Sequence, residues 1–185
     1  MTLSWPNHLL TLEEWDALPE VEGVRLELAE GLVVMSPMPL SLHQRAAMRL
    51  GYRIDEQLPR DLTAVSGVEV IVCDPPPTVR VPDVSVSFSR TVERNPARLR
   101  ASDVLLAVEL LSDGTRKVDK ILKFSEYAEA GIPQYWIIDL DDPTSMLAYI
   151  LVNGNYELSG EHTGKPALDV AGQPVEIDLP ALTRR

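Results

Sequence analysis

The feature that most constrains the fold is a strand, a helix and a strand in succession in the second half of the chain. Residues 105–111 are apolar except for Glu109, which is typical of a strand covered on both faces. Residues 116–130 have helical spacing and end at Gly131, a common helix stop signal. Residues 134–139, QYWIID, then form the next strand. The pattern predicts two buried strands with a helix between them.

Shorter elements are expected on either side of this unit. The patterns predict helices at residues 11–18 (with a capping box at its start) and 41–58, hairpins at residues 24–28 with 32–35 and 146–152 with 156–158, strands at residues 65–73 and 79–88, and a loop at residues 90–102. The expected class is α/β or α+β, a mixed β-sheet core flanked by helices. We expect one domain over residues 1–185, with its core at about residues 12–140 and a C-terminal hairpin extension.

The distribution of charge limits which partners the chain can have. Seventeen Lys and Arg against 28 Asp and Glu give a net charge of −11, which argues against a protein coated in nucleic acid. Residues 84–123 nevertheless carry +3, and the rest of the chain carries −14. We therefore expect weak or selective contact with nucleic acid through one local basic patch. No aromatic residue is interleaved with the cations of residues 90–100, so base stacking as in single-strand-binding proteins is not indicated.

The cysteine content and the apolar segments indicate the cellular setting. A single cysteine, Cys73, can form neither an intramolecular disulfide nor a cysteine-cluster zinc site, which predicts a reducing, cytoplasmic environment. The N-terminus lacks the features of a secretory signal, and every apolar run is far shorter than the roughly 20 residues of a membrane helix. We expect a soluble protein with no membrane partner.

Two carboxylates stand within apolar segments and are the first candidates for chemistry. An unpaired charge in a protein interior costs several kcal/mol, so Glu109 needs a compensating partner. It either pairs with an arginine at a strand end, reaches solvent from an edge, or binds a metal. Asp83 raises the same question, unless Pro82 marks the strand start and Asp83 is only a turn or edge residue. Two carboxylates on adjacent strands could converge on a hard cation such as Mg²⁺.

A cationic segment follows the Glu109 strand. The simplest interpretation of such a charge run is a solvated helix face. A helical wheel predicts a buried stripe and a polar side, namely Val118, Ile121, Leu122, Ser125 and Ala128 against Asp119, Lys123 and Tyr127. On this prediction Lys123 would have to reach around the helix to approach Glu109.

The order of these motifs resembles the Uma-two family of restriction endonucleases, within the PD-(D/E)XK nuclease superfamily. The resemblance covers residues 12–139 and rests on Glu27 in RLELAEGLVVMSP, His43, Val-Pro-Asp83-Val, Val-Glu109-Leu-Leu-Ser, and the run Arg116, Asp119, Lys123, Tyr127, Gly131 and QYWIID. It implies a restriction-endonuclease-like fold and an enzyme that hydrolyses phosphodiester bonds of nucleic acid, DNA first of all. It also implies that Asp83, Glu109 and the Leu110 carbonyl hold Mg²⁺, or Mn²⁺ in its place.

The resemblance also implies roles for individual side chains. The catalytic set would be Glu27, Asp83, Glu109 and Lys123. The superfamily motif has a lysine two residues after Glu109, where this chain has Leu111. The resemblance implies that Lys123, on the following helix, takes the place of that lysine.

Three further cations and one histidine complete the implied site. Arg116, Lys117 and Lys120 would contact the nucleic-acid backbone, which positions the substrate without reading its sequence. His43 would be an accessory acid–base group, although a lone histidine on a helix is more often a surface or core residue.

Two other functions stay open on the sequence. A non-catalytic binding or assembly protein on the same fold is favoured by Leu111. A metal-dependent hydrolase of a small anionic substrate would suit the net charge of −11 better than long DNA does. A homodimer is a plausible state, because two-fold symmetry suits an enzyme that cuts both strands of a duplex.

Overall fold

Two mixed β-sheets and five α-helices build the part of the chain that the computed structural model describes. It describes residues 7–19, 21–111 and 118–184, and of residues 118–121 only the backbone. The helices are α1 (Leu12–Asp16), α2 (Ser41–Asp55), α3 (Ser89–Val92), α4 (Val118–Glu129) and α5 (Leu179–Thr183), with a 3-10 turn η1 (Ala101–Asp103).

The larger sheet has six strands and contains the strand–helix–strand unit. Its order is β11 (Asn155–Thr163), β10 (Ser145–Val152), β9 (Gln134–Asp139), β8 (Val104–Leu111), β6 (Val84–Phe88) and β3 (Leu62–Ser66). β8 and β9 are parallel and joined through α4, whereas the other neighbours are antiparallel. β8 therefore lies in the interior of the sheet.

The smaller sheet has five strands and carries the N-terminal hairpin. Its order is β2 (Leu32–Pro37), β1 (Val24–Ala29), β5 (Thr78–Arg80), β4 (Glu69–Cys73) and β7 (Arg98–Arg100). A separate two-stranded ribbon, β12 (Ala167–Val170) with β13 (Gln173–Glu176), precedes α5.

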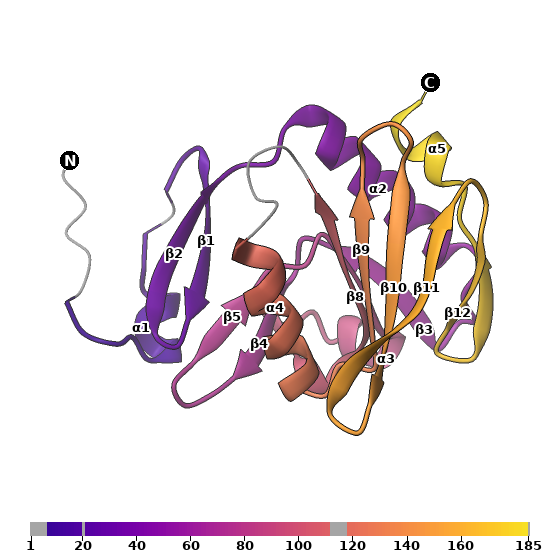
Figure 1. Cartoon of the computed structure of the whole chain (residues 1–185). Helices are drawn as coiled ribbons and strands as arrows, with labels where there is room; N and C mark the ends of the chain where they lie inside the picture. Colours follow the sequence, from indigo (N-terminus) through magenta and orange to yellow (C-terminus); the bar gives the residue numbers. More distant parts are fainter. Residues whose placement is uncertain (1–6, 20, 112–117, 185) are drawn as a thin grey trace.

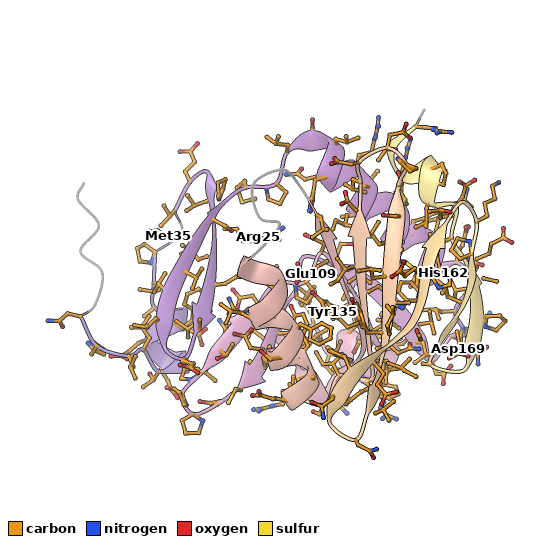
Figure 2. All side chains as sticks on the ribbon, in the orientation of Figure 1. Arg25, Met35, Glu109, Tyr135, His162 and Asp169 are labelled. Carbon is orange, nitrogen blue, oxygen red and sulfur yellow. The ribbon has the colours of Figure 1, made fainter. Side chains whose placement is uncertain are left out.

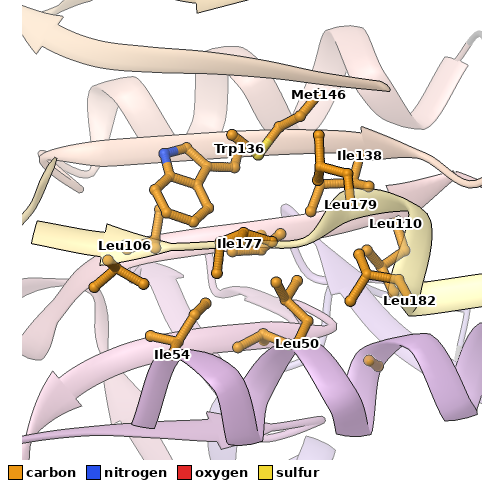
Figure 3. Close-up of a cluster of buried hydrophobic side chains, with 14 of the residues drawn as sticks. Leu50, Ile54, Leu106, Leu110, Trp136, Ile138, Met146, Ile177, Leu179 and Leu182 are labelled. Atoms are coloured by element: carbon orange, nitrogen blue, oxygen red, sulfur yellow. The ribbon is translucent and has the colours of Figure 1, made fainter. Parts of the chain in front are cut away.

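Helices cover both faces of the larger sheet. Figure 1 shows α4 in front of this sheet and α2 behind it. On the α2 side, Leu50 and Ile54 pack with Trp136 on β9, and Ile177 and Leu182 from the C-terminal segment close the same cluster (Figure 3). On the α4 side, buried residues of α4 pack with tyrosines of β9 and β11. Burial on both faces explains why β8 and β9 read as apolar runs.

Several predictions from the sequence are confirmed. The mixed α and β class agrees with the structure, as does the strand–helix–strand unit. The β1–β2 hairpin turns at Glu30 and Gly31, whose φ angles of 48° and 80° are the left-handed values that a tight hairpin turn requires. The capping box at α1 is present, since Thr11 and Glu14 exchange hydrogen bonds.

Three predictions of secondary structure are wrong. The expected strand at residues 65–73 is two strands, β3 and β4, because Gly67 takes a φ of 66° and turns the chain. The expected strand at residues 79–88 is also two, β5 and β6, because Pro82 has no amide hydrogen for a sheet ladder. The expected loop at residues 90–102 contains most of α3, all of β7 and most of η1.

The helices of the described part of the chain have one further property. None of them is both long enough and apolar enough to cross a membrane.

The C-terminal segment should contribute to stability as a core element does. Ile177 is fully buried between α2 and the larger sheet, whereas Ile150 on β10 is 41% exposed. We expect Ile177→Ala to lower the free energy of unfolding by roughly 2–5 kcal/mol, because it leaves a cavity in a packed cluster. The matched change Ile150→Ala should cost much less. Urea unfolding of both variants tests this, and equal losses would contradict the assigned packing.

Candidate active site

Asp83 is fixed at the start of β6 by bonds to the neighbouring strand. Its amide donates to the Val108 carbonyl at 3.0 Å, and its carboxylate Oδ2 accepts from the Leu110 amide at 2.8 Å. The other oxygen, Oδ1, lies 3.2 Å from Arg25 Nη1 on β1. Burial alone would raise the pKa of Asp83, but His43, the Leu110 amide and Arg25 lower it below its ordinary value. Asp83 is therefore a buried, ionised carboxylate with partners from two sheets.

His43 reaches the same carboxylate from α2. Its Nε2 lies 3.2 Å from Asp83 Oδ2 and 3.2 Å from the Leu110 carbonyl oxygen. Burial favours the neutral imidazole, yet the hydrogen bond and the charge of Asp83 raise the pKa of His43 above its ordinary value. The structure thus brings His43 into the site, and two oxygens from different strands converge on its Nε2 atom.

Glu109 projects from β8 towards α4. Its Oε1 accepts from Tyr127 Oη at 2.9 Å and lies 3.1 Å from Lys123 Nζ. The side chain is 13% exposed on an interior strand, so Glu109 is not an edge residue facing solvent. Figure 2 shows Glu109 on the larger sheet and Arg25 on the hairpin of the smaller one.

Glu27 joins this group from the centre of β1. Its Oε1 accepts from the Val81 amide at 2.9 Å and lies 3.0 Å from Lys123 Nζ, while Oε2 lies 3.3 Å from Arg80 Nη1. Burial would raise the pKa of Glu27, but Lys123, the Val81 amide and Arg80 lower it. Arg80 itself is buried and forms a two-pronged pair with Glu126 on α4, at 2.6 and 2.7 Å. The pair therefore ties α4 to β5.

The predicted orientation of α4 is wrong. Lys123 and Tyr127 are 6% and 0% exposed, whereas Leu122 is 50% exposed and Ser125 is exposed. Ala128 is buried as expected, and the side chains of residues 118–121 lie outside the described part. The wheel treated Lys123 as a surface group, but two carboxylates satisfy its ammonium inside the fold. Lys123 therefore reaches Glu109 directly.

The carboxylates of this region outnumber the cations that the structure places against them. Glu27, Asp83, Glu109 and Glu126 face Arg25, Arg80 and Lys123, with His43 able to add a fourth positive charge. Burial, together with the charges of Asp83 and Glu27, raises the pKa of Glu109 to about 7, against the opposing effect of Lys123. Lys123 has a raised pKa despite its burial, because Glu109 and Glu27 stabilise its charged form. A proton or another cation near Glu109 would complete the balance.

The chemistry of these donors fits a hard divalent cation. Mg²⁺ is usually held by one or two carboxylates, with water and substrate phosphate as its remaining ligands. Asp83, Glu109 and the Leu110 carbonyl supply two carboxylates and one carbonyl oxygen. Asp83 Oδ2 and the Leu110 oxygen already lie around one point, the Nε2 atom of His43. Within the described residues, no three His, Cys, Asp or Glu side chains are grouped as a metal site, so the assigned set has only two side-chain ligands beside the main-chain carbonyl.

Some of the predicted site residues lie in the candidate site, and others lie outside the described residues. Lys123 contacts Glu27 and Glu109, and Asp83 contacts His43 and the Leu110 amide. These two groups adjoin at β8, where Glu109 and Leu110 follow one another. Arg116 and Lys117, the first two expected nucleic-acid contacts, lie outside the described residues, and Lys120 is described only by its backbone.

Three residues that hold this site together were given no role in it by the sequence reasoning. Arg25 contacts Asp83, Arg80 joins Glu27 to Glu126, and Tyr127 donates to Glu109. Arg80 carries the same signal that identified Glu109, a charged residue between two apolar residues of an expected strand. Tyr127 lies four residues after Lys123, which places both on one helix face.

The raised pKa of Glu109 predicts a pH dependence of stability. Its pKa in the folded state, about 7, lies above the ordinary value of 4.5, so the folded state keeps a proton that the unfolded chain releases between these values. The contribution of Glu109 to stability therefore falls as pH rises through this window. Relative to wild type, Glu109→Gln should gain about 3 kcal/mol between pH 4.5 and pH 7.

Urea unfolding of wild type and Glu109→Gln across this pH range measures the difference. The exposed change Glu157→Gln serves as the control and should follow wild type. Parallel curves for wild type and Glu109→Gln would show that Glu109 has an ordinary pKa.

Comparison with known proteins completes the description of the site. The crystal structure of a "putative nuclease belonging to DUF820" from Anabaena variabilis ATCC 29413 has the same fold, with a TM-score of 0.71 at 21% identity over 94% of this chain and 97% of that one. No curated protein matches the chain. The sequence matches the Uma2 family, described as "Putative restriction endonuclease", over residues 12–181. The resemblance inferred from the motifs is thus confirmed, and the chain belongs to the Uma2 family.

Proposed function

We propose that the chain is a metal-dependent nuclease that hydrolyses phosphodiester bonds of DNA. The observation that carries the proposal is the buried Lys123 ammonium, 3.1 Å from Glu109 and 3.0 Å from Glu27. The superfamily motif has its lysine on the strand, where this chain has Leu111. Helix α4 supplies an ammonium to the same carboxylate, so the departure at Leu111 does not remove the charge from the site.

Asp83, Glu109 and the Leu110 carbonyl would hold Mg²⁺ or Mn²⁺. When bound, such an ion polarises a phosphoryl oxygen and lowers the pKa of water. The Leu110 amide and Arg25 fix the Asp83 carboxylate, so its orientation is set before a ligand arrives. Preorganised ligands of this kind need little rearrangement during the reaction.

Lys123 acts as a fixed positive charge and not as a base. Its pKa is raised by Glu109 and Glu27, so the ammonium keeps its proton at neutral pH. A cation in a dry site stabilises negative charge that develops on a phosphate more strongly than a cation in water does. Glu27, with its lowered pKa, stays anionic and holds the ammonium in place.

The DNA backbone would be bound next to this centre. We assign this contact to Arg116, Lys117 and Lys120, which belong to the segment of the chain with net positive charge. In the sequence, Arg116 and Lys117 lie between β8 and α4, and Lys120 lies in the first turn of α4. A two-fold dimer would present two such sites to the two strands of a duplex.

Metal binding should depend on the two carboxylates. We expect Asp83→Asn and Glu109→Gln each to weaken Mn²⁺ or Mg²⁺ binding by more than about tenfold, because each replaces a charged carboxylate ligand by a neutral amide of similar shape. Isothermal titration calorimetry measures this. Asp142→Asn is a matched control, since the Asp142 side chain is 88% exposed and forms only a long ion pair with Arg184. Unchanged binding in both site variants would remove the metal site.

Cleavage should depend on the Lys123 ammonium. We expect Lys123→Met to lower the rate of DNA cleavage with Mn²⁺ by about 10²–10³-fold, as for the loss of one preorganised charge-stabilising group. Supercoiled and single-stranded DNA are the substrates, and the exposed change Lys165→Met is the control.

Two outcomes would overturn the proposal in different ways. Full activity in Lys123→Met would exclude this residue from the reaction. Absence of cleavage of either DNA by folded wild-type protein would favour a non-catalytic binding protein on this fold. Thermal unfolding of Lys123→Met and Lys123→Arg shows whether a loss of activity comes from a loss of folding, because Lys123→Arg keeps the charge.

A further inference from the structure

A groove of about 360 Å³ begins at the candidate site and follows α2. Arg25, His43 and Asp83 line one end, so the groove is continuous with the residues assigned to phosphodiester chemistry. Arg25 Nη1 lies 3.2 Å from Asp83 Oδ1 and 3.5 Å from the Val81 carbonyl oxygen, and the Arg25 side chain is 21% exposed. A guanidinium has five N–H donors, so Arg25 can also donate to an anion in the groove.

The other end of the groove has a different chemistry. Met48 and Tyr52 lie one turn apart on α2 and are 64% and 65% exposed, although both are large and apolar over most of their surface. Ser66, at the end of β3, and Gly67, in the turn after it, form the opposite wall. This end therefore offers a thioether and an aromatic ring to a flat ligand.

Gly51 lies between the two walls. It is inside α2, where glycine costs about 1 kcal/mol relative to alanine. A Cβ atom at this position would lie 2.9 Å from Ser66 Oγ, so an alanine here would require the Ser66 hydroxyl to rotate away. The glycine also leaves the base of the groove without a side chain.

Asp55 limits what the far end can accept. Its Oδ1 accepts from Thr63 Oγ1 at 2.8 Å and from the Ala64 amide at 2.9 Å, which fixes the carboxylate at the groove wall. A second phosphate would be repelled there, whereas the amino edge of a base would be favoured. The groove thus has a cation at one end and an aromatic ring with an acceptor at the other.

We propose that this groove is a subsite for one unpaired nucleotide next to the cleaved phosphate. The phosphate is bound by Arg25, and the base lies against Tyr52 and Met48. The volume is in the lower range of small-molecule pockets, which suits a single nucleotide and excludes a duplex. This inference rests on the proposed nuclease function and narrows its substrate to single-stranded or locally opened nucleic acid. Base stacking was not indicated by the sequence, because Tyr52 lies on α2, far along the chain from the cationic segment.

Binding of a mononucleotide tests the subsite without requiring cleavage. The probe is dAMP, titrated into the full chain without metal and followed by amide NMR. We expect chemical-shift changes at the amides of Met48, Gly51 and Ser66. The affinity for dAMP should be about 5- to 100-fold weaker in Tyr52→Ala, because the free energy of stacking one base on an aromatic ring corresponds to a factor of this size. Tyr52→Phe keeps the ring and should stay within about twofold of wild type. Leu158→Ala, an exposed change on β11, is the remote control.

The outcomes separate this inference from the nuclease proposal. Deoxyadenosine, which lacks the phosphate, should bind at least about tenfold more weakly than dAMP if Arg25 holds the phosphate. Equal binding of the two, or dAMP shifts away from the groove, would overturn the subsite. Cleavage of single-stranded DNA with an unchanged KM in Tyr52→Ala would also overturn it while leaving the nuclease intact. If dAMP binds in the groove but the protein cleaves no DNA, the nucleotide-binding site is supported and the proposed nuclease function is contradicted.

Discussion

The Lys123 ammonium, buried between Glu27 and Glu109, is the interaction on which the site depends. Glu27 belongs to the smaller sheet, Glu109 to the larger one, and Lys123 to the helix that covers the larger sheet. One charge therefore connects three layers of the fold. Removing it would leave two carboxylates in a largely dry environment, which costs several kcal/mol. One turn further along α4, the Arg80–Glu126 pair adds a second link between α4 and the smaller sheet.

The same charges explain why the region suits a cation. Burial makes each carboxylate costly, and three cations compensate most but not all of the negative charge around Asp83 and Glu109. Burial, and after it the charges of Asp83 and Glu27, raise the pKa of Glu109 to about 7. A proton neutralises Glu109 at low pH, and a divalent ion of the kind proposed above would offset its charge at neutral pH. Metal binding and protonation of Glu109 would thus compete for one site, which links affinity for the ion to pH.

Local patterns were sufficient for much of the fold and for the charged candidates. Apolar runs, the capping box and the Glu30–Gly31 turn depend on neighbours in sequence, so they could be read directly. Glu109 and Asp83 were recognisable because a carboxylate in an apolar strand needs a partner. The orientation of α4 could not be read, because helical periodicity counts Lys123 as polar and ignores carboxylates that are distant in sequence. Arg25 was missed for the same reason, since its partner Asp83 is 58 residues away.

The position of the ammonium on α4, in place of Leu111 on β8, has a consequence for how the site can change. A lysine at position 111 would have its backbone held by the pairing of Leu111 with Asp139 on β9, so its Cα would move with the sheet. Leu111 instead packs in the apolar cluster under α4, and the charge is carried by the helix that covers this cluster. Displacement of α4 would remove the charge while leaving Asp83 and Glu109 on an intact sheet.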